Sequence, residues 1–171
     1  MSVIIFECKR CGTCCRNLVE DFNGISSGLF LTSKETRLFS SKLISPKIAL
    51  GVDKPKRNVA YQLNVSICPH INERNECRIY DRRPLACKSF PFEMGLFRST
   101  VSVKCPQIGT KMKVDEYREV ELSGTEIEAG KKLNTYLLNR YRKYFRKGVK
   151  SWKFDLKTRK WFMHNIEQIP M

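Results

Sequence analysis

The residues best suited to chemistry in this sequence are its eight cysteines. Four form the run Cys8-x2-Cys11-x2-Cys14-Cys15, and the others are Cys68, Cys77, Cys87 and Cys105. A Cys-x2-Cys step lets two thiolates on one tight turn face the same ion, while the amides of the turn remain free to hydrogen-bond sulfur. Gly12, inside the second step, suits the backbone bend that this turn requires. All eight cysteines are therefore candidate metal ligands.

The spacing is compatible with two kinds of metal centre. Three cysteines at this spacing with a distant fourth are typical of a 4Fe-4S cluster, and Cys68 and Cys105 are each followed by proline, as cluster ligands often are. Zinc would use the same thiolates tetrahedrally, and eight of them would complete two four-sulfur sites. We predict an iron–sulfur cluster, with zinc as the alternative. Adjacent Cys14 and Cys15 are expected to diverge along an extended backbone, so that one serves another ion or is a plain buried thiol.

Cations near the cysteines are expected to offset the mutual repulsion of clustered thiolates. The basic residues beside the cysteines are Lys9, Arg10, Arg16, Arg78, Arg82, Arg83 and Lys88. Taken one at a time, most of them are equally well explained as solvated surface residues.

Short strands are predicted to hold the cysteine segments in place. The β-branched and aromatic residues 3–6 lead into the first cysteine group, and another short strand is predicted over residues 28–31. Apolar residues alternate with polar ones over 59–65 and again over 97–104, in each case just ahead of a cysteine.

A helix is predicted after the second of these strands. Thr32 can cap its first turn and Glu35 can reach back to the cap, a capping box that opens a helix to about Leu43. Residues 47–58, which include glycine, proline and several lysines, predict a surface loop. A short helix over 114–120 is the best interpretation of a weak pattern.

The last third of the chain predicts a long helix and a hairpin. Thr125 and Glu128 offer a second capping box, and Gly148 ends the helix. Its apolar face consists of Leu133, Leu137, Tyr141, Tyr144 and Phe145. Alternating aromatic and polar residues over 152–163 predict two strands joined by a turn over 157–160.

Together these elements predict an α+β protein in two parts. We predict a small, strand-supported, cysteine-rich metal-binding domain over residues 1–110, and a basic helix with a β-hairpin over residues 111–171 packed on it. The first residues carry no basic leader and only a short apolar run, which predicts neither a signal peptide nor a membrane span and favours the cytoplasm. In that reducing compartment, thiol clusters bind metal more often than they form disulfides.

The chain is strongly basic, with 32 lysines and arginines against 17 acids and a formal net charge of +15. Such a charge favours polyanionic partners through long-range attraction and counterion release. Residues 131–161 hold twelve of the basic residues and one acid, Asp155. We predict RNA as the partner, on the ribosome and with ribosomal proteins as further contacts. The predicted RNA-binding residues are Arg140, Arg142, Lys143, Arg146, Lys147, Lys150, Lys153, Arg159 and Lys160.

Aromatic residues interleave with these basic ones and leave two alternatives open. Exposed aromatic rings could stack on unpaired bases. At helical and strand spacing, however, aromatic residues more often pack into a core. A merely solvated basic surface and an anionic membrane surface are the alternatives to RNA binding.

The sequence predicts no catalytic site. It contains no Gly-x-Gly turn after a strand for a nucleotide cofactor, and no paired carboxylates in a suggestive motif. His70 and His164 are candidates for a Cys-His pair, but each is more often an ordinary residue. We therefore predict a binding protein with no small-molecule substrate in preference to an enzyme.

Two cysteine motifs together resemble a known family. The run from Cys8 to Cys15, followed by Cys77-Arg78-Ile79-Tyr80-Asp81-Arg82-Arg83-Pro84-Leu85-Ala86-Cys87-Lys88-Ser89-Phe90-Pro91, is similar to the CxxCxxCC family of zinc- or iron-chelating proteins over residues 5 to 110. The resemblance implies a metal-binding module in which all eight cysteines ligate. A similar module occurs in flagellin lysine methylases, where it implies an iron–sulfur cluster. The rival hypotheses are thus an iron–sulfur redox protein, an accessory subunit of a protein lysine methylase, and a metal-delivery protein.

Overall fold

The chain folds into two compact units, each built from two segments. The computed structural model describes residues 4–94, 99–109, 120–122, 124–144 and 146–164. Unit 1 comprises residues 1–17 and 67–134, and unit 2 comprises residues 18–66 and 135–171. Helices and several sheets are both present, so the predicted α+β class is confirmed. The predicted boundary between residues 110 and 111 lies outside the described residues and stays a prediction.

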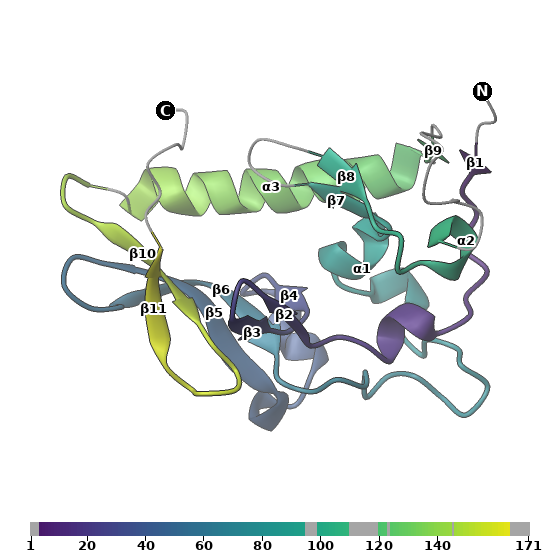
Figure 1. The fold of residues 1–171 in the computed structure, drawn as a ribbon, viewed down its shortest axis with the longest axis horizontal. Coiled ribbons are helices and arrows are strands. Elements are labelled where there is room, and N and C mark those ends of the chain that lie inside the picture. The colour runs from purple at the N-terminus through teal and green to yellow at the C-terminus, as the bar shows by residue number, and fades with distance from the viewer. Residues whose placement is uncertain (1–3, 95–98, 110–119, 123, 145, 165–171) are drawn as a thin grey trace. The chain divides into compact units, whose positions relative to one another are not determined.

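Unit 2 is organised around a five-stranded antiparallel sheet (Figure 1). Its strand order is β11-β10-β5-β6-β4, with β4 at Phe30–Leu31, β5 at Ile44–Gly51, β6 at Arg57–Leu63, β10 at Lys150–Phe154 and β11 at Trp161–His164. The predicted strand over 59–65 and the predicted hairpin of the last third are therefore confirmed. A second hairpin joins β2 (Glu20–Phe22) to β3 (Ile25–Ser27) through Asn23 and Gly24, both in the left-handed region.

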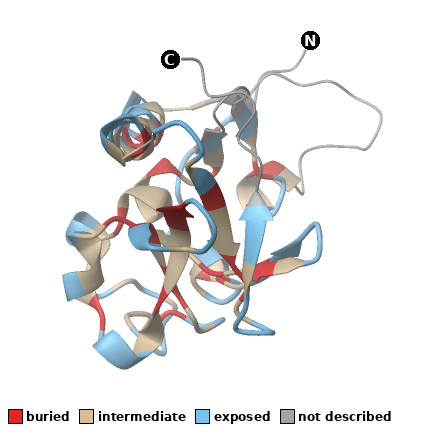
Figure 2. Ribbon diagram, turned by 90° about the vertical axis from the view of Figure 1, so that its left-hand side faces the viewer, coloured by how far each residue is buried: buried red, intermediate tan, exposed pale blue. Residues whose placement is uncertain are grey.

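The core of unit 2 lies where the end of a long helix packs against this sheet. Leu50 and Val59 from the sheet and Tyr141 from helix α3 (Gly124–Tyr144) are all buried in one cluster. Buried residues lie in the second half of β6, at Val59, Ala60, Gln62 and Leu63, and at Ser151 and Phe154 of β10 (Figure 2). The predicted helix is thus confirmed, and Leu137, Tyr141 and Tyr144 of its predicted apolar face lie at this core, whereas Phe145 lies outside the described residues. No helix of the described chain is long and apolar enough to cross a membrane.

Unit 1 consists of short elements around a smaller core. It contains β1 (Ile4–Ile5) paired with β9 (Val120–Glu121), and β7 (Phe92–Met94) paired with β8 (Ser99–Val101). Its short helices are the 3-10 turns η1 (Thr13–Cys15) and η4 (Tyr80–Arg82) and the α-helices α1 (Leu85–Ser89) and α2 (Pro106–Gly109). Phe6, Cys105 and Ile108 form the buried cluster. The helix predicted over 114–120 falls outside the described residues.

The helix predicted from Thr32 to Leu43 is wrong. Its capping box does form, because the Thr32 N–H donates to Glu35 Oε2 over 2.8 Å and the Glu35 N–H donates to Thr32 Oγ1 over 3.4 Å. The chain then makes only two 3-10 turns, η2 (Glu35–Leu38) and η3 (Ser41–Leu43). The serines and threonines of this segment hydrogen-bond the backbone locally, as the Thr36 hydroxyl does with the Ser33 carbonyl, and compete with a continuous helix.

The surface loop predicted over 47–58 is also wrong. Strand β5 runs through its first half, with Ala49 and Leu50 buried, and β6 begins at Arg57. The lysine, proline and glycine in the segment suggested a loop, but β5 is bulged next to Pro46, where proline can be accommodated in a sheet. The second predicted capping box places Thr125 at the helix cap, but the helix already includes Gly124, and Glu128 forms an ion pair of 2.7 Å with Lys132.

Candidate metal centre

All eight cysteines lie in unit 1, and all are free thiols. Cys8, Cys11 and Cys14 are exposed, Cys15, Cys77 and Cys87 are half-buried, and Cys68 and Cys105 are buried. Unit 2 contains no cysteine. The fold thus gathers into one compact unit residues that are separated by almost a hundred positions in the sequence.

Gly12 allows the first cysteine loop to turn against the second. It has a φ of 74°, in the left-handed region, and opens the 3-10 turn η1 that carries Cys14 and Cys15. A Cβ atom at Gly12 would lie 2.8 Å from the Asn75 Cβ and 2.8 Å from the Ile71 Cδ1. Only glycine fits both the backbone conformation and the available space.

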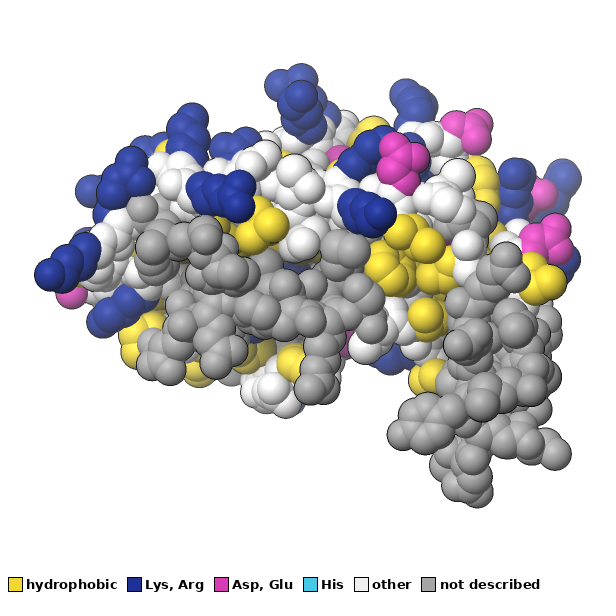
Figure 3. Space-filling model, turned by 90° about the horizontal axis from the view of Figure 1, so that it is seen from above, with side chains coloured by type: hydrophobic (Ala, Val, Ile, Leu, Met, Phe, Trp, Pro, Cys, Tyr) yellow, Lys and Arg dark blue, Asp and Glu magenta, His cyan; other side chains and the backbone are white. Residues whose placement is uncertain are grey.

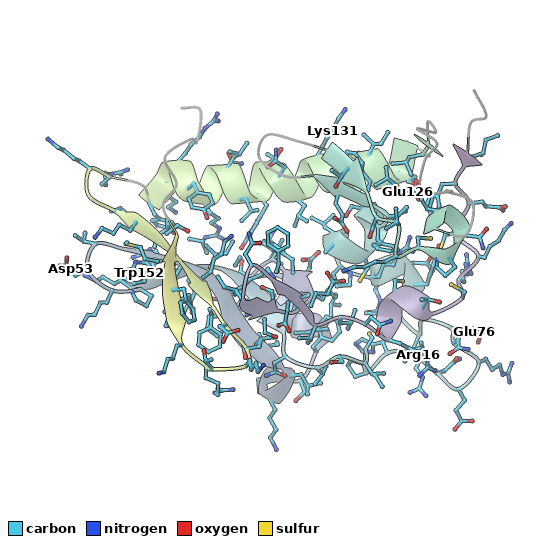
Figure 4. The ribbon with its side chains drawn as sticks, viewed as in Figure 1. Arg16, Asp53, Glu76, Glu126, Lys131 and Trp152 are labelled. Atoms are coloured by element: carbon cyan, nitrogen blue, oxygen red, sulfur yellow. The ribbon has the colours of Figure 1, made fainter. Side chains whose placement is uncertain are left out.

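Hydrogen bonds hold the two loops together. The Arg16 guanidinium donates to Asn75 Oδ1 over 2.6 and 3.1 Å, and the Cys68 N–H donates to the Cys15 carbonyl over 2.8 Å. Figure 4 shows Arg16 close to the loop that carries Glu76. These contacts bring the Cys14-Cys15 pair to the start of the loop that follows Cys68.

Asn72 shapes the loop between Cys68 and Cys77. Its Oδ1 accepts hydrogen bonds from the N–H groups of Arg74 and Glu76 over 2.9 and 2.8 Å, and its Nδ2 donates to Glu76 Oε2 over 2.9 Å. The loop closes with a bridge between Ile71 and Cys77. Sequence reasoning missed Asn72, although an asparagine that bonds the backbone two residues on is a known turn signal.

The thiols make a chain of contacts. The thiols of Cys14 and Cys15 hydrogen-bond each other, and Cys15 also bonds Cys68. Cys77 and Cys87 lie within electrostatic reach of both Cys14 and Cys68. The expectation that Cys14 and Cys15 diverge is therefore wrong, because η1 curls the backbone instead of extending it.

Cys105 joins this group through Cys11 and Cys14, whose charges act on it. Cys8 lies exposed at the start of the run. Across the described ranges, no three Cys, His, Asp or Glu side chains already form a finished cation site.

Hydrogen bonds between the thiols lower the pKa of some cysteines and raise the pKa of others. The Cys15 thiol and the backbone N–H groups of His70 and Ile71 lower the pKa of Cys68 to about 6. The Cys15 thiol likewise lowers the pKa of Cys14 to about 7, and the pKa of Cys15 itself is raised because it holds the shared protons. The thiolate forms of Cys14 and Cys68 are thus favoured relative to an ordinary thiol, which suits a metal ligand.

The two Cys-Pro segments each close a turn onto the carbonyl of the cysteine. The Ile71 N–H donates to the Cys68 carbonyl over 3.2 Å, and the Ile108 N–H donates to the Cys105 carbonyl over 2.9 Å. In both segments the amides two and three residues after the cysteine also hydrogen-bond its sulfur. Such N–H groups stabilise thiolates and tune metal–sulfur centres. Burial opposes them at Cys105 and raises its pKa.

The predicted RNA-binding residues are mostly exposed. Of the nine, Arg140 and Lys153 are half-buried and the other seven are exposed. Arg140 donates to the Ser33 hydroxyl over 3.2 Å and lies 5.3 Å from the Tyr136 ring centroid, so it is already engaged within unit 2. Figure 3 views the molecule from the side that carries α3, and there Lys and Arg side chains outnumber acidic ones.

The aromatic residues among them pack within unit 2. The Trp152 Nε1 donates to the Gly51 carbonyl over 3.1 Å, and the Tyr136 hydroxyl donates to the Val59 carbonyl over 3.0 Å. Phe154 is buried against Trp161, with ring centroids 5.1 Å apart. These rings support the core rather than a base-stacking surface.

Comparison with known proteins points to the cysteines. A family model named for the pattern CxxCxxCC, and described as a putative zinc- or iron-chelating domain, matches residues 7–129. The matched region contains all eight cysteines. No curated protein and no solved structure matches the chain significantly.

Proposed function

This chain belongs to the CxxCxxCC family, and from that membership we propose that its eight cysteines hold an iron–sulfur or zinc centre that pins unit 1 together. The proposed ligands are Cys8, Cys11, Cys14, Cys15, Cys68, Cys77, Cys87 and Cys105. The metal is proposed to replace the apolar core that such short elements lack, because the free energy of metal binding then becomes free energy of folding.

The convergence of thiols from four separate segments carries this proposal. Cys14, Cys68, Cys77 and Cys87 influence one another, although they come from η1, two loops and α1. The donor set is sulfur alone, which suits zinc and iron better than magnesium or calcium. The amides bonded to Cys68 and Cys105 support bound thiolates in the same way.

An iron–sulfur cluster is the favoured centre, with zinc as the alternative. A cluster would be held by thiolates of the Cys-x2-Cys run together with those from later segments, and it would supply redox chemistry. Zinc would supply only a tetrahedral cross-link. A structural role is proposed for either metal.

The decisive measurement is metal and sulfide analysis, with a visible spectrum, of protein purified without oxygen. Iron with acid-labile sulfide and broad visible absorbance supports a cluster, and a colourless protein with zinc supports tetrahedral sites. A protein with neither metal, or with its cysteines joined in disulfides, contradicts the proposal. A cluster that cycles reversibly in the folded protein would instead favour the redox or methylase-subunit alternative.

A cysteine variant tests the structural role. Cys87→Ser is expected to lose metal and to unfold unit 1, because a serine hydroxyl does not replace a thiolate ligand. Ala86→Ser is the matched control, since it places the same hydroxyl one residue earlier in α1 without removing a thiol. A folded, metal-free Cys87→Ser protein would contradict a structural centre.

We further propose that the basic end of α3 and the following segment bind RNA, with the ribosome as the site. The observation in favour is that Arg142, Lys143, Arg146 and Lys147 are all exposed within six positions, with no acid among them. Such a stretch can neutralise several phosphates. Because the aromatic rings are engaged elsewhere, the proposed contacts are to phosphates and not to bases.

The RNA test compares two variants of equal charge. One changes Arg142, Lys143, Arg146 and Lys147 to Gln, and the other changes the exposed residues Lys34, Arg37, Lys42 and Lys54 to Gln. Binding to a structured RNA is measured across a salt series. The first variant should bind more weakly with a slope of log K against log salt reduced by about one per lost contact. Equal losses in both variants, or salt-insensitive binding, would contradict the proposal.

A further inference from the structure

Arg83 has a fixed position beside the cysteines. Its guanidinium lies 3.7 Å from the Tyr80 ring centroid, and its Nη1 donates to the Tyr80 carbonyl over 2.9 Å. The Tyr80 N–H in turn donates to the Cys77 carbonyl over 3.2 Å. Stacking and a hydrogen bond together restrict a side chain that otherwise has many rotamers. The positive charge of Arg83 is therefore held close to the backbone that carries Cys77.

A second guanidinium shares the same ring. Arg10, from the loop between Cys8 and Cys11, lies 4.0 Å from the Tyr80 centroid and has a φ of 53°, which is costly for a residue other than glycine. Two cations on one ring repel each other, so the arrangement is favourable where negative charge lies nearby. A metal–thiolate centre supplies that charge, because four thiolates outnumber the two charges of a zinc ion.

The guanidinium of Arg83 lies within electrostatic reach of thiols from three segments: Cys14 in η1, Cys77 in the loop before η4, and Cys87 in α1. A single cation is thus placed beside thiols that come from separate parts of the chain.

We infer that Arg83, clamped on Tyr80, is the charge-compensating residue of the metal centre and strengthens metal binding without being a ligand. The inference rests on the proposed function, and it selects one residue from the seven basic neighbours of the cysteines. Arg82 provides the matched control, because it is exposed and carries the same charge one residue earlier.

The experiment measures zinc affinity by competition with a chromophoric chelator in wild type, Arg83→Met, Arg83→Lys and Arg82→Met. Arg83→Met should bind zinc 10- to 100-fold more weakly, the usual range for a lost outer-shell partner, and Arg82→Met should stay within about twofold of wild type. Arg83→Lys keeps the charge and should recover most of the affinity. The deficit of Arg83→Met should shrink from about 0.05 M to about 1 M salt, because salt screens charge but not packing.

The possible outcomes separate this inference from the proposed function. Equal affinities in Arg83→Met and Arg82→Met overturn the inference alone, and so does a salt-independent deficit that Arg83→Lys does not relieve. Failure of the wild-type protein to bind zinc or iron overturns the proposed function. If Arg83→Met does not fold, Arg83→Gln replaces it, since it keeps a donor for the Tyr80 carbonyl and loses only the charge. A deficit no larger than that of Arg82→Gln then overturns the inference.

Discussion

The first cysteine loop requires glycine at position 12 for two separate reasons, one in the backbone and one in the packing. Gly12 has a positive φ, and its missing side chain leaves room for Asn75 and Ile71. Gly24 also has a positive φ, 76°, but no atom lies within 4 Å of the position that its Cβ would occupy. A comparison of substitutions at Gly12 and Gly24 therefore distinguishes the cost of backbone strain from the cost of steric crowding.

Gly12→Ala is expected to destabilise unit 1 by more than the roughly 1–2 kcal/mol of left-handed strain, because it also pushes the 71–75 loop away from η1. Gly24→Ala should cost only the strain and should leave metal affinity unchanged. Thermal unfolding and zinc competition of both variants check this. Equal effects of the two substitutions on metal binding would contradict the packing argument.

Lys47 is a half-buried lysine in unit 2 whose ammonium hydrogen-bonds two neutral groups. Its Nζ donates to the Ser27 hydroxyl and to the Gly28 carbonyl, each over 2.9 Å. Burial lowers the pKa of Lys47 to about 8, and repulsion from Lys153 adds to the decrease. Between pH 8 and the ordinary lysine pKa near 10.5, the unfolded chain therefore binds a proton that the folded protein has released.

Lys47→Met should stabilise unit 2 relative to wild type most strongly below pH 8, and this advantage should shrink as the pH rises toward 10.5. The change across that window is on the order of 3 kcal/mol, and loss of the two hydrogen bonds reduces the net gain at any one pH. Urea unfolding at pH 7 and at pH 10 gives the comparison, and Lys54→Met, at an exposed site, serves as the control. A pH-independent difference would contradict the lowered pKa of Lys47.

At the residue scale, the candidate metal ligands were easier to predict from the sequence than the hydrogen bonds and stacking contacts around them. The eight cysteines and Gly12 stand out by type and spacing, so they were identified from sequence. Asn72 did not, because one asparagine among polar loop residues carries little signal until its hydrogen bonds are known. Arg83 was one of seven basic neighbours, and what separates it from the others is its hydrogen bond to the Tyr80 carbonyl in addition to its stacking on the Tyr80 ring, which Arg10 shares.

Among the elements, the β10–β11 hairpin is stabilised by hydrogen bonds to one aspartate, Asp155. Asp155 is buried, and its carboxylate accepts hydrogen bonds from the Ser26 N–H over 2.6 Å and the Thr158 N–H over 2.8 Å, as well as from the Thr158 hydroxyl. These bonds lower the pKa of Asp155, the hydroxyl of Thr158 being the largest cause. Stability that depends on them is lost as the pH falls through that lowered pKa.

Asp155→Asn should destabilise unit 2 by about 2 kcal/mol, because the new amide nitrogen cannot accept the hydrogen bonds from Thr158. Asp53→Asn is the control, since Asp53 is exposed beyond the end of β5 (Figure 4). Urea unfolding followed by tryptophan fluorescence measures the difference. Equal stability of the two variants would show that the Asp155 contacts contribute little.

The elements divide between those with a local signal and those without. Helix α3 and the β10–β11 hairpin have long, regular patterns of apolar residues, and both were predicted. Strand β5 was not, because its neighbours β6 and β10 and its bulge beside Pro46 decide its conformation. The helix predicted after Thr32 does not form, because a favourable cap is not enough when the serines and threonines that follow it hydrogen-bond the backbone locally.

For the molecule as a whole, the two units differ in what holds them together. Unit 1 has all the cysteines, and unit 2 has both tryptophans, Trp152 and Trp161, in its sheet. Tryptophan fluorescence is therefore a selective probe of unit 2. The interleaving of segments was not predicted, because contacts between distant parts of a chain leave no local pattern.

Metal removal should loosen unit 1 and leave unit 2 folded. A chelator that strips the metal is expected to speed amide hydrogen exchange over residues 68–88, because metal binding contributes to the folding of that segment. The tryptophan emission maximum should stay at its native wavelength. A red shift that accompanies metal loss would show that the stability of unit 2 also depends on the metal.

The interleaved segments also constrain how the protein is made. A polypeptide emerges from its N-terminus, so Cys8 to Cys15 are exposed before the cysteines that join them have been translated. Strand β5 likewise waits for β10, whose Lys153 pairs with Ile48. Neither unit can close while the chain is half synthesised, and the proposed ligand set is complete only after Cys105 has appeared. Completion of the proposed metal centre is therefore expected only after residue 105 has been synthesised.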